Sequence, residues 1–457
     1  MQSLKCSEII GAVNGKLLSG NIDLTIDNIS IDSRNIKPGD FFIPIIGERF
    51  DGHDFIISSF EKGAVIALTE KNLAPFDGKT LIKVKSTLTA LRNLAAFYRS
   101  KFDIPFIAIT GSVGKTSTKD IIASVLSQKY KVLKTAGNFN NEIGLPLSIF
   151  RMEKEHEIAI FEMGMSGFGE ISRLSSIVKP DYAVITNIGL SHIDKLGSRQ
   201  NILKAKTEIF EFLSPKGVAI LNGDDNLLHG LKDLLKVRTL FYGTEEGLDY
   251  QAYDLLSLGE QGCKFKISIN DTEYNVRTST PGFHNVYNAL AAISLGIEFN
   301  VPMDLIIKGI YEYKPSDLRL NIVVKNDIKV INDTYNASPK SMEAALDVLK
   351  DISTDGKRVA VLGDMLEMGE WAYKVHLDVG KYAALKGIDL ILTVGENAQN
   401  IAVGALSGGI SGENVKSFDD NKSVCIYLEK IVRAGDIVLV KGSRGMKMEQ
   451  IVQELTK

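Results

Sequence analysis

The sequence has little cysteine, no excess of basic residues and no long apolar run, and each shortage excludes a class of protein. Its three cysteines, Cys6, Cys263 and Cys425, are widely separated, so they form neither a disulfide framework nor a zinc-binding pattern. We expect them to be buried small hydrophobic residues in a reducing compartment. The net charge of −3 gives no sign that the protein binds nucleic acid or an anionic membrane.

Membrane insertion and secretion also find no support. No stretch reaches the roughly 18 apolar residues of a membrane span. The opening residues, "MQSLKCSEIIGAVNGK", hold no apolar core of a signal peptide. We therefore expect a cytoplasmic protein without a membrane span, and a monomer. An anionic substrate stays compatible with the overall charge if local positive groups meet it.

The length and pattern of the chain predict three α/β domains. A chain of 457 residues allows three domains of about 150 residues, and it has no repeat of fixed period. Short apolar strands alternate with helical segments throughout, which predicts an α/β fold. We place the domains at residues 1–102, 103–313 and 314–457, with Pro105 and Pro315 near the two boundaries.

The central domain has the strongest pattern. Its apolar strands alternate with helices, which predicts a mostly parallel, doubly wound sheet. The segment "CKFKISINDTEYNVRTS" predicts a β-hairpin that turns at Asn270 and Asp271. The predicted strands lie in "FIAIT", "KVLKT", "EIAIFEMG", "YAVITNIG" and "GVAILNGDD", and the predicted helices include 201–213 and 285–299.

The flanking domains follow the same alternation. The last domain has four apolar strands, "IKVINDT", "RVAVLGD", "LILTVGE" and "DIVLVKGS", which predict a Rossmann-like sheet. The other predicted elements are strands at 41–47 and 63–70, helices at 87–102, 340–350 and 447–455, and a Gly/Ser-rich loop at 404–414.

The segment "AITGSVGKTSTKD" (108–120) predicts a phosphate-binding loop. It follows a strand and opens a helix, so free N–H groups and the helix dipole point at an anion. The usual template requires a glycine six residues before the lysine, where this chain has Ile109. Lys115 can still reach the phosphates and Thr116 can ligate Mg²⁺. The nucleotide-binding residues expected here are Gly111, Ser112, Val113, Gly114, Lys115, Thr116 and Ser117.

Glu162 and His192 each follow a predicted strand of the same sheet. Ligands of open parallel sheets bind beyond the carboxyl ends of the strands, so both residues are candidate metal ligands beside Thr116. A lone histidine would more often be structural, but the pair favours a site. From spacing alone, Lys204 and Lys206 are interpreted as surface lysines.

The loop "AGNFNNEIGLPL" (136–147) contains Asn138, Asn140 and Asn141. Their side-chain amides could donate to phosphate or carboxylate oxygens. Ordinary turn chemistry also favours Asn and Gly, so both interpretations stay open.

Taken together, these motifs resemble the Mur ligase family over essentially the whole chain. The family comprises ATP-dependent amino-acid or peptide ligases of peptidoglycan synthesis. Within it, residues 30–56 and the segments "NDTYNASPKSM" and "LGDMLEMG" are most similar to members that add D-alanyl-D-alanine. The other matching segments are "TGSVGKTSTK", "GNFNNEIGLPL", "FEMG", "TNIGLSHID", "KAKTEIF", "PGFHNVYNALAA", "LRLNIV" and "VLVKGSRGMKME".

The resemblance implies a role for specific residues. Lys206 matches the family lysine that CO₂ carbamylates into an anionic metal-site ligand, which replaces its interpretation as a surface lysine. Asn288, supported by Asn285, is implied to contact adenine, Arg319 the phosphates and Asp333 the ribose. The implied metal ligands are Thr116, Glu162, His192 and Lys206; the implied catalytic residues are Lys115, Lys206, His192 and Glu162; the implied substrate residues are Ser33, Arg34, Asn138, Asn140, Asn141, Tyr335 and Asn336.

The implied reaction joins D-alanyl-D-alanine to UDP-N-acetylmuramoyl-tripeptide at the expense of ATP, with two Mg²⁺ ions. The acceptor carboxylate would take the γ-phosphoryl group, because positioning and charge neutralisation suffice for this step. The dipeptide amine would then displace phosphate from the acyl phosphate. Two alternatives remain: a related ligase that adds a single amino acid, and a P-loop ATPase that acts as a switch.

Overall fold

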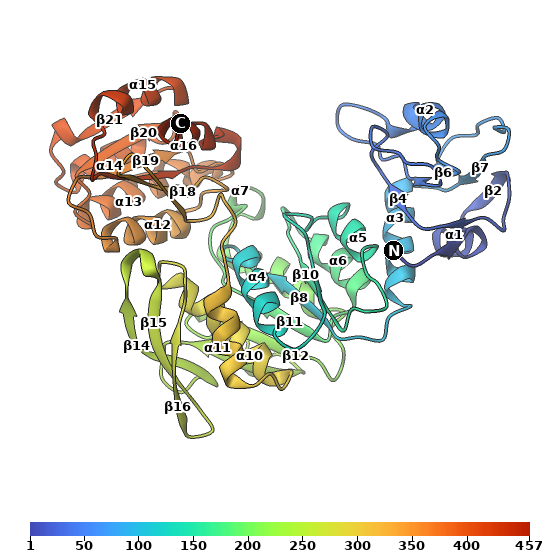
Figure 1. Ribbon diagram of the computed structural model, residues 1–457, viewed down its shortest axis with the longest axis horizontal. Coiled ribbons are helices and arrows are strands. Elements are labelled where there is room, and N and C mark those ends of the chain that lie inside the picture. The colour runs from blue at the N-terminus through green and yellow to red at the C-terminus, as the bar shows by residue number, and fades with distance from the viewer.

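The computed structural model describes residues 1–457 as three α/β units in succession. In Figure 1 the N-terminal and C-terminal units form two arms, and the central unit lies between and below them. The expected α/β fold class is therefore confirmed. No helix combines the length and the hydropathy that a membrane crossing requires.

The N-terminal unit has a five-stranded sheet with the order β2-β7-β6-β5-β4. Its strands are β2 (Lys16–Ser19), β7 (Thr80–Lys83), β6 (Ile66–Thr69), β5 (Phe41–Phe42) and β4 (Ile29–Ser30), and only β2 runs antiparallel to its neighbour. The strand expected at 41–47 is wrong beyond Phe42. Pro44 has no N–H to donate to a ladder, so regular pairing stops there.

Helix α3 (Thr87–Arg99) connects the N-terminal unit to the central one. It packs against α1 (Cys6–Val13) on one side, and against α5 (Gly144–Ile149) and α6 (Glu170–Val178) on the other. The Tyr98 hydroxyl donates to the Met152 carbonyl at 2.7 Å. The boundary predicted after residue 102 therefore falls just beyond a helix that both units share, and it stays a prediction.

The central unit has a nine-stranded sheet with the order β16-β15-β14-β13-β12-β11-β8-β10-β9. The seven strands β8 to β14 pair in parallel. Strands β15 and β16 add an antiparallel hairpin. Their bounds are β8 (Phe106–Thr110), β9 (Val132–Lys134), β10 (Ile158–Glu162), β11 (Tyr182–Ile185), β12 (Val218–Asn222), β13 (Arg238–Gly243), β14 (Tyr250–Ser257), β15 (Cys263–Ile269) and β16 (Thr272–Arg277).

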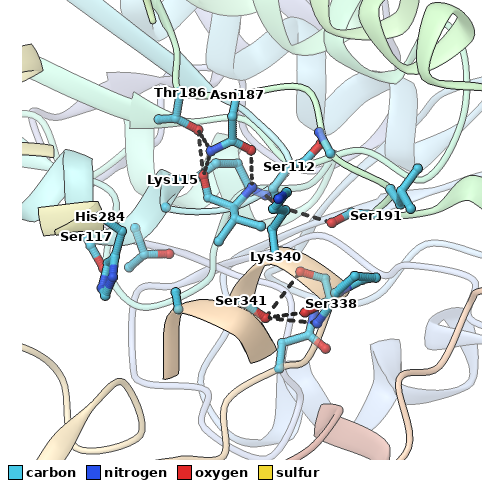
Figure 2. Close-up of a pocket in the computed structure, with 18 of the residues that line it drawn as sticks. Ser112, Lys115, Ser117, Thr186, Asn187, Ser191, His284, Ser338, Lys340 and Ser341 are labelled. Carbon is cyan, nitrogen blue, oxygen red and sulfur yellow. Dashed lines mark hydrogen bonds between the residues drawn. The ribbon is translucent and has the colours of Figure 1, made fainter. Parts of the chain in front are cut away.

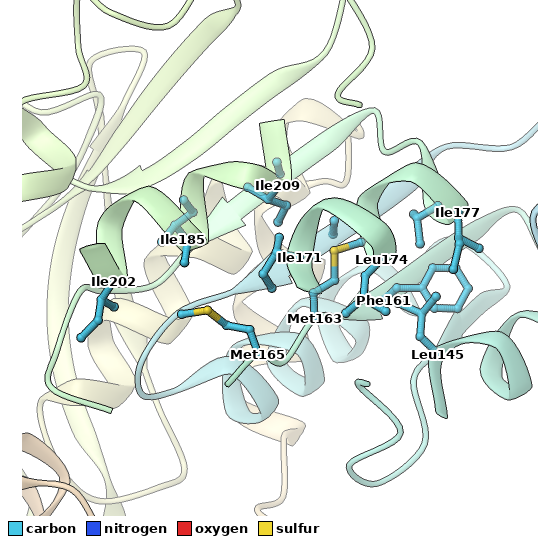
Figure 3. Close-up of a cluster of buried hydrophobic side chains, with 14 of the residues drawn as sticks. Leu145, Phe161, Met163, Met165, Ile171, Leu174, Ile177, Ile185, Ile202 and Ile209 are labelled. Atoms are coloured by element: carbon cyan, nitrogen blue, oxygen red, sulfur yellow. The ribbon is translucent and has the colours of Figure 1, made fainter. Parts of the chain in front are cut away.

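Helices cover both faces of this sheet, as a doubly wound fold requires. On one face, α4 (Lys115–Leu126) packs with α10 (His284–Glu298) and α11 (Met303–Glu312). On the other face, α6 and α8 (Arg199–Thr207) bury Ile171, Leu174 and Ile202 against strand residues such as Phe161 (Figure 3). The predicted hairpin turn is confirmed, because Asn270 and Asp271 have φ of 49° and 62°.

The C-terminal unit has a six-stranded sheet with the order β17-β18-β22-β19-β20-β21, parallel except for β17. The predicted loop at 404–414 is wrong at its start, since α14 continues to Ser407 and packs on α13. The elements are β17 (Asn321–Lys325), β18 (Ile328–Asp333), β19 (Arg358–Gly363), β20 (Leu390–Val394), β21 (Val415–Phe418), β22 (Ile437–Lys441), α12 (Pro339–Asp351), α13 (Ala372–Leu385), α14 (Gln399–Ser407), α15 (Asn421–Ile431) and α16 (Glu449–Leu455).

Candidate active site

The phosphate-loop segment lies between β8 and α4, at the carboxyl edge of the central sheet. Gly111 and Gly114 have φ of 150° and 87°, which side chains rarely adopt. A Cβ on Gly111 would lie 1.9 Å from the Thr186 Oγ1 atom. The short loop thus needs glycine at 111 because the neighbouring strand end touches it directly.

The end of β11 holds the apex of this loop in place (Figure 2). Asn187 accepts from the Val113 N–H at 3.0 Å and donates to the Val113 carbonyl at 2.9 Å. The Thr186 hydroxyl donates to the same carbonyl at 2.6 Å, and the Gly189 N–H donates to the Ser112 hydroxyl at 2.8 Å. Sequence reasoning missed Thr186 and Asn187, although both stand in the quoted "TNIG" segment.

A cleft of about 1100 Å³ opens at this loop, between the central and C-terminal units. It is lined by residues 112–117 of the loop together with Asn140, Asn141, Glu162, His192, Asn285, Asn288, Arg319, Asp333, Tyr335 and Asn336. The structure therefore brings most of the predicted site residues to one cavity, and Gly111 directly precedes the lining residue Ser112 in the chain. Lys206, Asn138, Ser33 and Arg34 are not among the lining residues.

Two cations face the phosphate loop, one from each unit. Lys115 Nζ folds back and donates to the Gly111 carbonyl at 2.8 Å. Burial lowers the pKa of Lys115, and the Glu162 carboxylate opposes this shift. Arg319 reaches across from the C-terminal unit and donates to the Thr116 hydroxyl at 3.0 Å, while its guanidinium stacks 3.9 Å from the Tyr335 ring centre.

Glu162 ends β10 and is buried beside the loop. Its Oε1 atom accepts from Asn140 at 2.8 Å, whereas its buried Oε2 atom has no hydrogen-bond partner. Lys119 lies 3.7 Å from that oxygen and is only 1% exposed. Sequence reasoning missed Lys119, although its position four residues after Lys115 puts it on the same helix face.

The donor set around the loop fits Mg²⁺ in part. The Thr116 hydroxyl and the unpartnered Glu162 oxygen are oxygen donors of the kind that Mg²⁺ prefers. No three His, Cys, Asp or Glu side chains gather closely enough to form a metal site by themselves. Mg²⁺ commonly uses one or two protein oxygens and completes its shell with phosphates and water.

Lys206 is 2% exposed, so the interpretation of this residue as a surface lysine is wrong. Burial lowers its pKa well below the usual value, and the charge of Lys115 adds to the shift. Its neighbour Lys204 is exposed, as expected. The helix α8 thus turns one lysine into the core and leaves the other in solvent.

His192 lines the cleft and has a left-handed backbone, with φ of 60°. Burial lowers the pKa of its imidazole, and Glu367 of the C-terminal unit opposes that shift. The Glu367 Oε2 atom lies 2.5 Å from His192 Nδ1. Sequence reasoning did not single out Glu367, although it stands in the quoted "LGDMLEMG" segment.

The residues expected to bind the nucleoside lie on two walls of the cleft. Asn288 accepts from the Thr118 hydroxyl at 2.8 Å and donates to Asn285 at 3.0 Å. Across the cleft, Asp333 pairs with the buried ammonium of Lys441 at 2.5 Å. Lys441, in the quoted "VLVKGS" segment, was also missed because spacing alone does not show that it faces Asp333.

The remaining predicted substrate residues divide into two groups. Asn141 accepts from the Ile143 and Gly144 N–H groups at 3.2 and 2.8 Å, which supports the turn interpretation for this residue. Ser33 and Arg34 lie in the N-terminal unit, away from the cleft; Arg34 is 85% exposed and pairs with Asp32 at 2.8 Å. They could meet only the far end of a long substrate.

Family comparisons cover all three units. The chain matches the Mur ligase middle domain over residues 109–296, the Mur ligase glutamate ligase domain over 318–444 and the Mur ligase family catalytic domain over 25–99. It is 40% identical to the UDP-N-acetylmuramoyl-tripeptide–D-alanyl-D-alanine ligase of Bacillus subtilis, over 97% of this chain and 96% of the relative.

Solved structures give the same result. A MurF crystal structure from Acinetobacter baumannii has a TM-score of 0.92 at 32% identity, covering 100% of this chain and 99% of that one. MurF ligase from Thermotoga maritima in complex with ADP has a TM-score of 0.84 at 30% identity, covering 94% and 97%. With this architecture, phosphate loop and cleft, the chain belongs to the Mur ligase family.

Proposed function

We propose that this protein is an ATP-dependent ligase that joins D-alanyl-D-alanine to UDP-N-acetylmuramoyl-tripeptide. The products are ADP, phosphate and UDP-N-acetylmuramoyl-pentapeptide, a peptidoglycan precursor. The relatives that match over nearly the full length carry this activity in their names. The main structural support is that one cleft holds a phosphate loop, Glu162 and His192 on one wall and Arg319, Tyr335 and Asn336 on the other.

The positive side chains support transfer of a phosphoryl group to a carboxylate. Lys115 bonds the Gly111 carbonyl and Arg319 bonds the Thr116 hydroxyl, so both cations would supply positive charge to a phosphate bound at the loop. The acceptor carboxylate attacks the γ-phosphorus, ADP leaves, and the acyl phosphate is then attacked by the dipeptide amine, which expels phosphate. Closure of the cleft by the C-terminal unit would exclude water from the acyl phosphate.

Thr116 and Glu162 would hold one Mg²⁺, and His192 with carbamylated Lys206 would hold the second. The bound ions would neutralise charge on the phosphates and on the acceptor carboxylate. Carbamylation requires a neutral amine, and burial lowers the pKa of Lys206 in the direction that leaves its amine neutral. The product would be an anionic carboxylate on a long arm.

The ends of the substrates would be held by residues on different units. Ser33 and Arg34 would contact the uridine diphosphate, and Tyr335 and Asn336 the incoming dipeptide. Asn140 is already hydrogen-bonded to Glu162, so it would act next to the metal. Asn285 and Asn288 would contact adenine, and Asp333 the ribose.

Product analysis tests this assignment. The protein is incubated with ATP, Mg²⁺, D-alanyl-D-alanine and a UDP-N-acetylmuramoyl-tripeptide that ends in either lysine or diaminopimelate, and the products are weighed by mass spectrometry. We expect the pentapeptide from at least one acceptor, and rapid ADP release only when acceptor and dipeptide are both present. ADP release without either substrate would favour an ATPase switch, and a tetrapeptide product formed only when free D-alanine replaces the dipeptide would favour a single-amino-acid ligase.

A further inference from the structure

The loop after β19, residues 364–371, reaches from the C-terminal unit to the short helix α7 (Ile193–Leu196) of the central unit. Glu367 Oε2 lies 2.5 Å from His192 Nδ1. Two residues later, a Cβ on Gly369 would lie 3.2 Å from Asp194. The loop therefore docks closely at the position where His192 enters the cleft.

Both partners in the contact have left-handed backbones. His192 has φ of 60° and Glu367 has φ of 62°. Residues other than glycine rarely adopt this conformation unless the surrounding structure imposes it, and they gather at functional sites. Here a residue of this kind from the central unit contacts one from the C-terminal unit. The two loops therefore hold both residues in defined backbone conformations at the contact.

The geometry gives the two ring nitrogens of His192 different surroundings. Nδ1 is buried and makes no hydrogen bond of regular geometry, and the Glu367 Oε2 atom lies 2.5 Å from it. Histidines that bind metals ordinarily present their second ring nitrogen to a carboxylate, which orients the ring and fixes its tautomer. With Glu367 at Nδ1, Nε2 is the ring nitrogen that stays available to a cation.

We propose that Glu367 is a positioning residue for His192, so that docking of the C-terminal unit completes the metal site of the central unit. This inference rests on the proposed function, since it assigns His192 to a cation. The contact between Glu367 and His192 thereby couples docking of the C-terminal unit to cation binding. The unit that brings the dipeptide also supplies the carboxylate that orients the imidazole, so the cation binds tightly only when that unit is docked.

The chain carries its own reporter of this contact. Trp371 is the single tryptophan of the protein and lies in the same loop, where its indole Nε1 is buried without a hydrogen-bond partner. Its fluorescence therefore reports whether the loop stays docked. Glu370, also in the loop, is exposed and offers a matched control for the loss of one carboxylate.

The test compares Glu367→Gln, Glu367→Ala and Glu370→Gln with the wild type. Mn²⁺ binding to the protein with ADP is measured by electron paramagnetic resonance, alongside the Mg²⁺ dependence of ligation, the KM for ATP and Trp371 emission. We expect Glu367→Gln to weaken Mn²⁺ binding and to raise the half-saturating Mg²⁺ concentration by about tenfold or more. The KM for ATP at saturating Mg²⁺ and the behaviour of Glu370→Gln should match the wild type.

Two outcomes would overturn the proposal. If Glu367→Ala shifts Trp371 emission and lowers the melting temperature while Mn²⁺ binding stays unchanged, the contact is only structural. If Glu367→Gln weakens binding of metal-free ADP as much as that of Mn²⁺, the residue shapes the whole cleft rather than the imidazole. Mn²⁺ binding needs no ligation, so a failure of the proposed function appears separately, as absence of pentapeptide from the wild type.

Discussion

At the scale of single residues, burial decides what the lysines of the central unit can do. Lys204 and Lys206 are two positions apart on α8, yet one is exposed and the other is in the core. Lys115 and Lys119 are four positions apart on α4, and one faces the loop while the other faces Glu162. The same residue type thus occurs as a solvated charge, a candidate phosphate ligand, a counter-ion and a candidate carbamate.

Removing Lys206 should abolish ligation. Lys206→Ala deletes the amine that the proposed carbamate requires, so we expect no detectable pentapeptide by mass spectrometry. A small carboxylate such as acetate should restore part of the rate, because it can occupy the vacated space as an anion. Lys204→Ala, on the exposed side of the same helix, serves as the control and should retain wild-type activity. Full activity of Lys206→Ala would remove this role.

Lys119 should contribute to stability through Glu162. Lys119→Met keeps the volume of the side chain but removes the cation that lies 3.7 Å from the buried Glu162 carboxylate, and breaking a buried ion pair typically costs roughly 3 kcal/mol. Lys134→Met removes a 45% exposed lysine that pairs with Asp120 at 2.7 Å, and it should cost less than about 1 kcal/mol. Both lysines contact Asp120, so urea unfolding of the two variants isolates the Glu162 contact. Equal effects would contradict the prediction.

At the scale of elements, local pattern predicted the parallel strands and the hairpin turn well. The local pattern predicted the wrong end of an element where a tertiary contact or a single proline changed its length. Pro44 ends the regular pairing of β5 at Phe42, and packing of α14 on α13 keeps residues 404–407 helical despite their Gly/Ser content. Apolar alternation is a local property, whereas the end of an element depends on what lies beside it.

The phosphate loop should tolerate no side chain at position 111. In Gly111→Ala the added methyl group would collide with Thr186 Oγ1, so we expect a loss of about 2 kcal/mol of stability and a large loss of ADP affinity. Unfolding curves and calorimetric titration of ADP measure the two effects. Gly11→Ala is the control, because a Cβ there meets no atom within 4 Å. Normal ADP affinity in Gly111→Ala would show that the loop adjusts.

At the scale of the whole molecule, the active site forms only where separate units meet. Arg319 bonds Thr116 across the cleft, Glu367 contacts His192, and Glu260 of the central unit pairs with Lys329 of the C-terminal unit at 2.7 Å. These three contacts involve different elements of the central unit. Their energies are therefore expected to depend on the relative position of the two units.

His284 should make this interface sensitive to acid. It starts α10 beside Asp333 and Lys441 of the C-terminal unit, and burial lowers its pKa to about 4 from 6.5. Between these two values the unfolded chain binds a proton that the folded protein resists, so stability falls as the pH falls from 6.5 to 4. Because His284 is partly exposed to solvent, we expect the free energy of unfolding to fall by about 2 kcal/mol over this pH interval.

Urea unfolding at pH 7 and pH 4.5 measures this contribution. The variant His284→Gln has no titratable ring, so it should lose less stability over the same interval than the wild type. Asp and Glu residues titrate in both proteins and cancel in the comparison. Parallel pH profiles for the two proteins would exclude His284 as the source.

The sequence by itself determined the fold class, the phosphate loop and the positions of Glu162 and His192 at the ends of strands, and the family resemblance added the residues of the C-terminal wall of the cleft. This was possible because strand periodicity, glycine positions and the carboxyl edge of a parallel sheet are local or topological properties. Only the tertiary structure decided that Lys206 is buried, that Lys119 and Lys441 face carboxylates and that Glu367 meets His192. Those facts depend on which side chains face one another across helices and across units. The spacing of residues along the chain does not determine which of them meet in the folded protein.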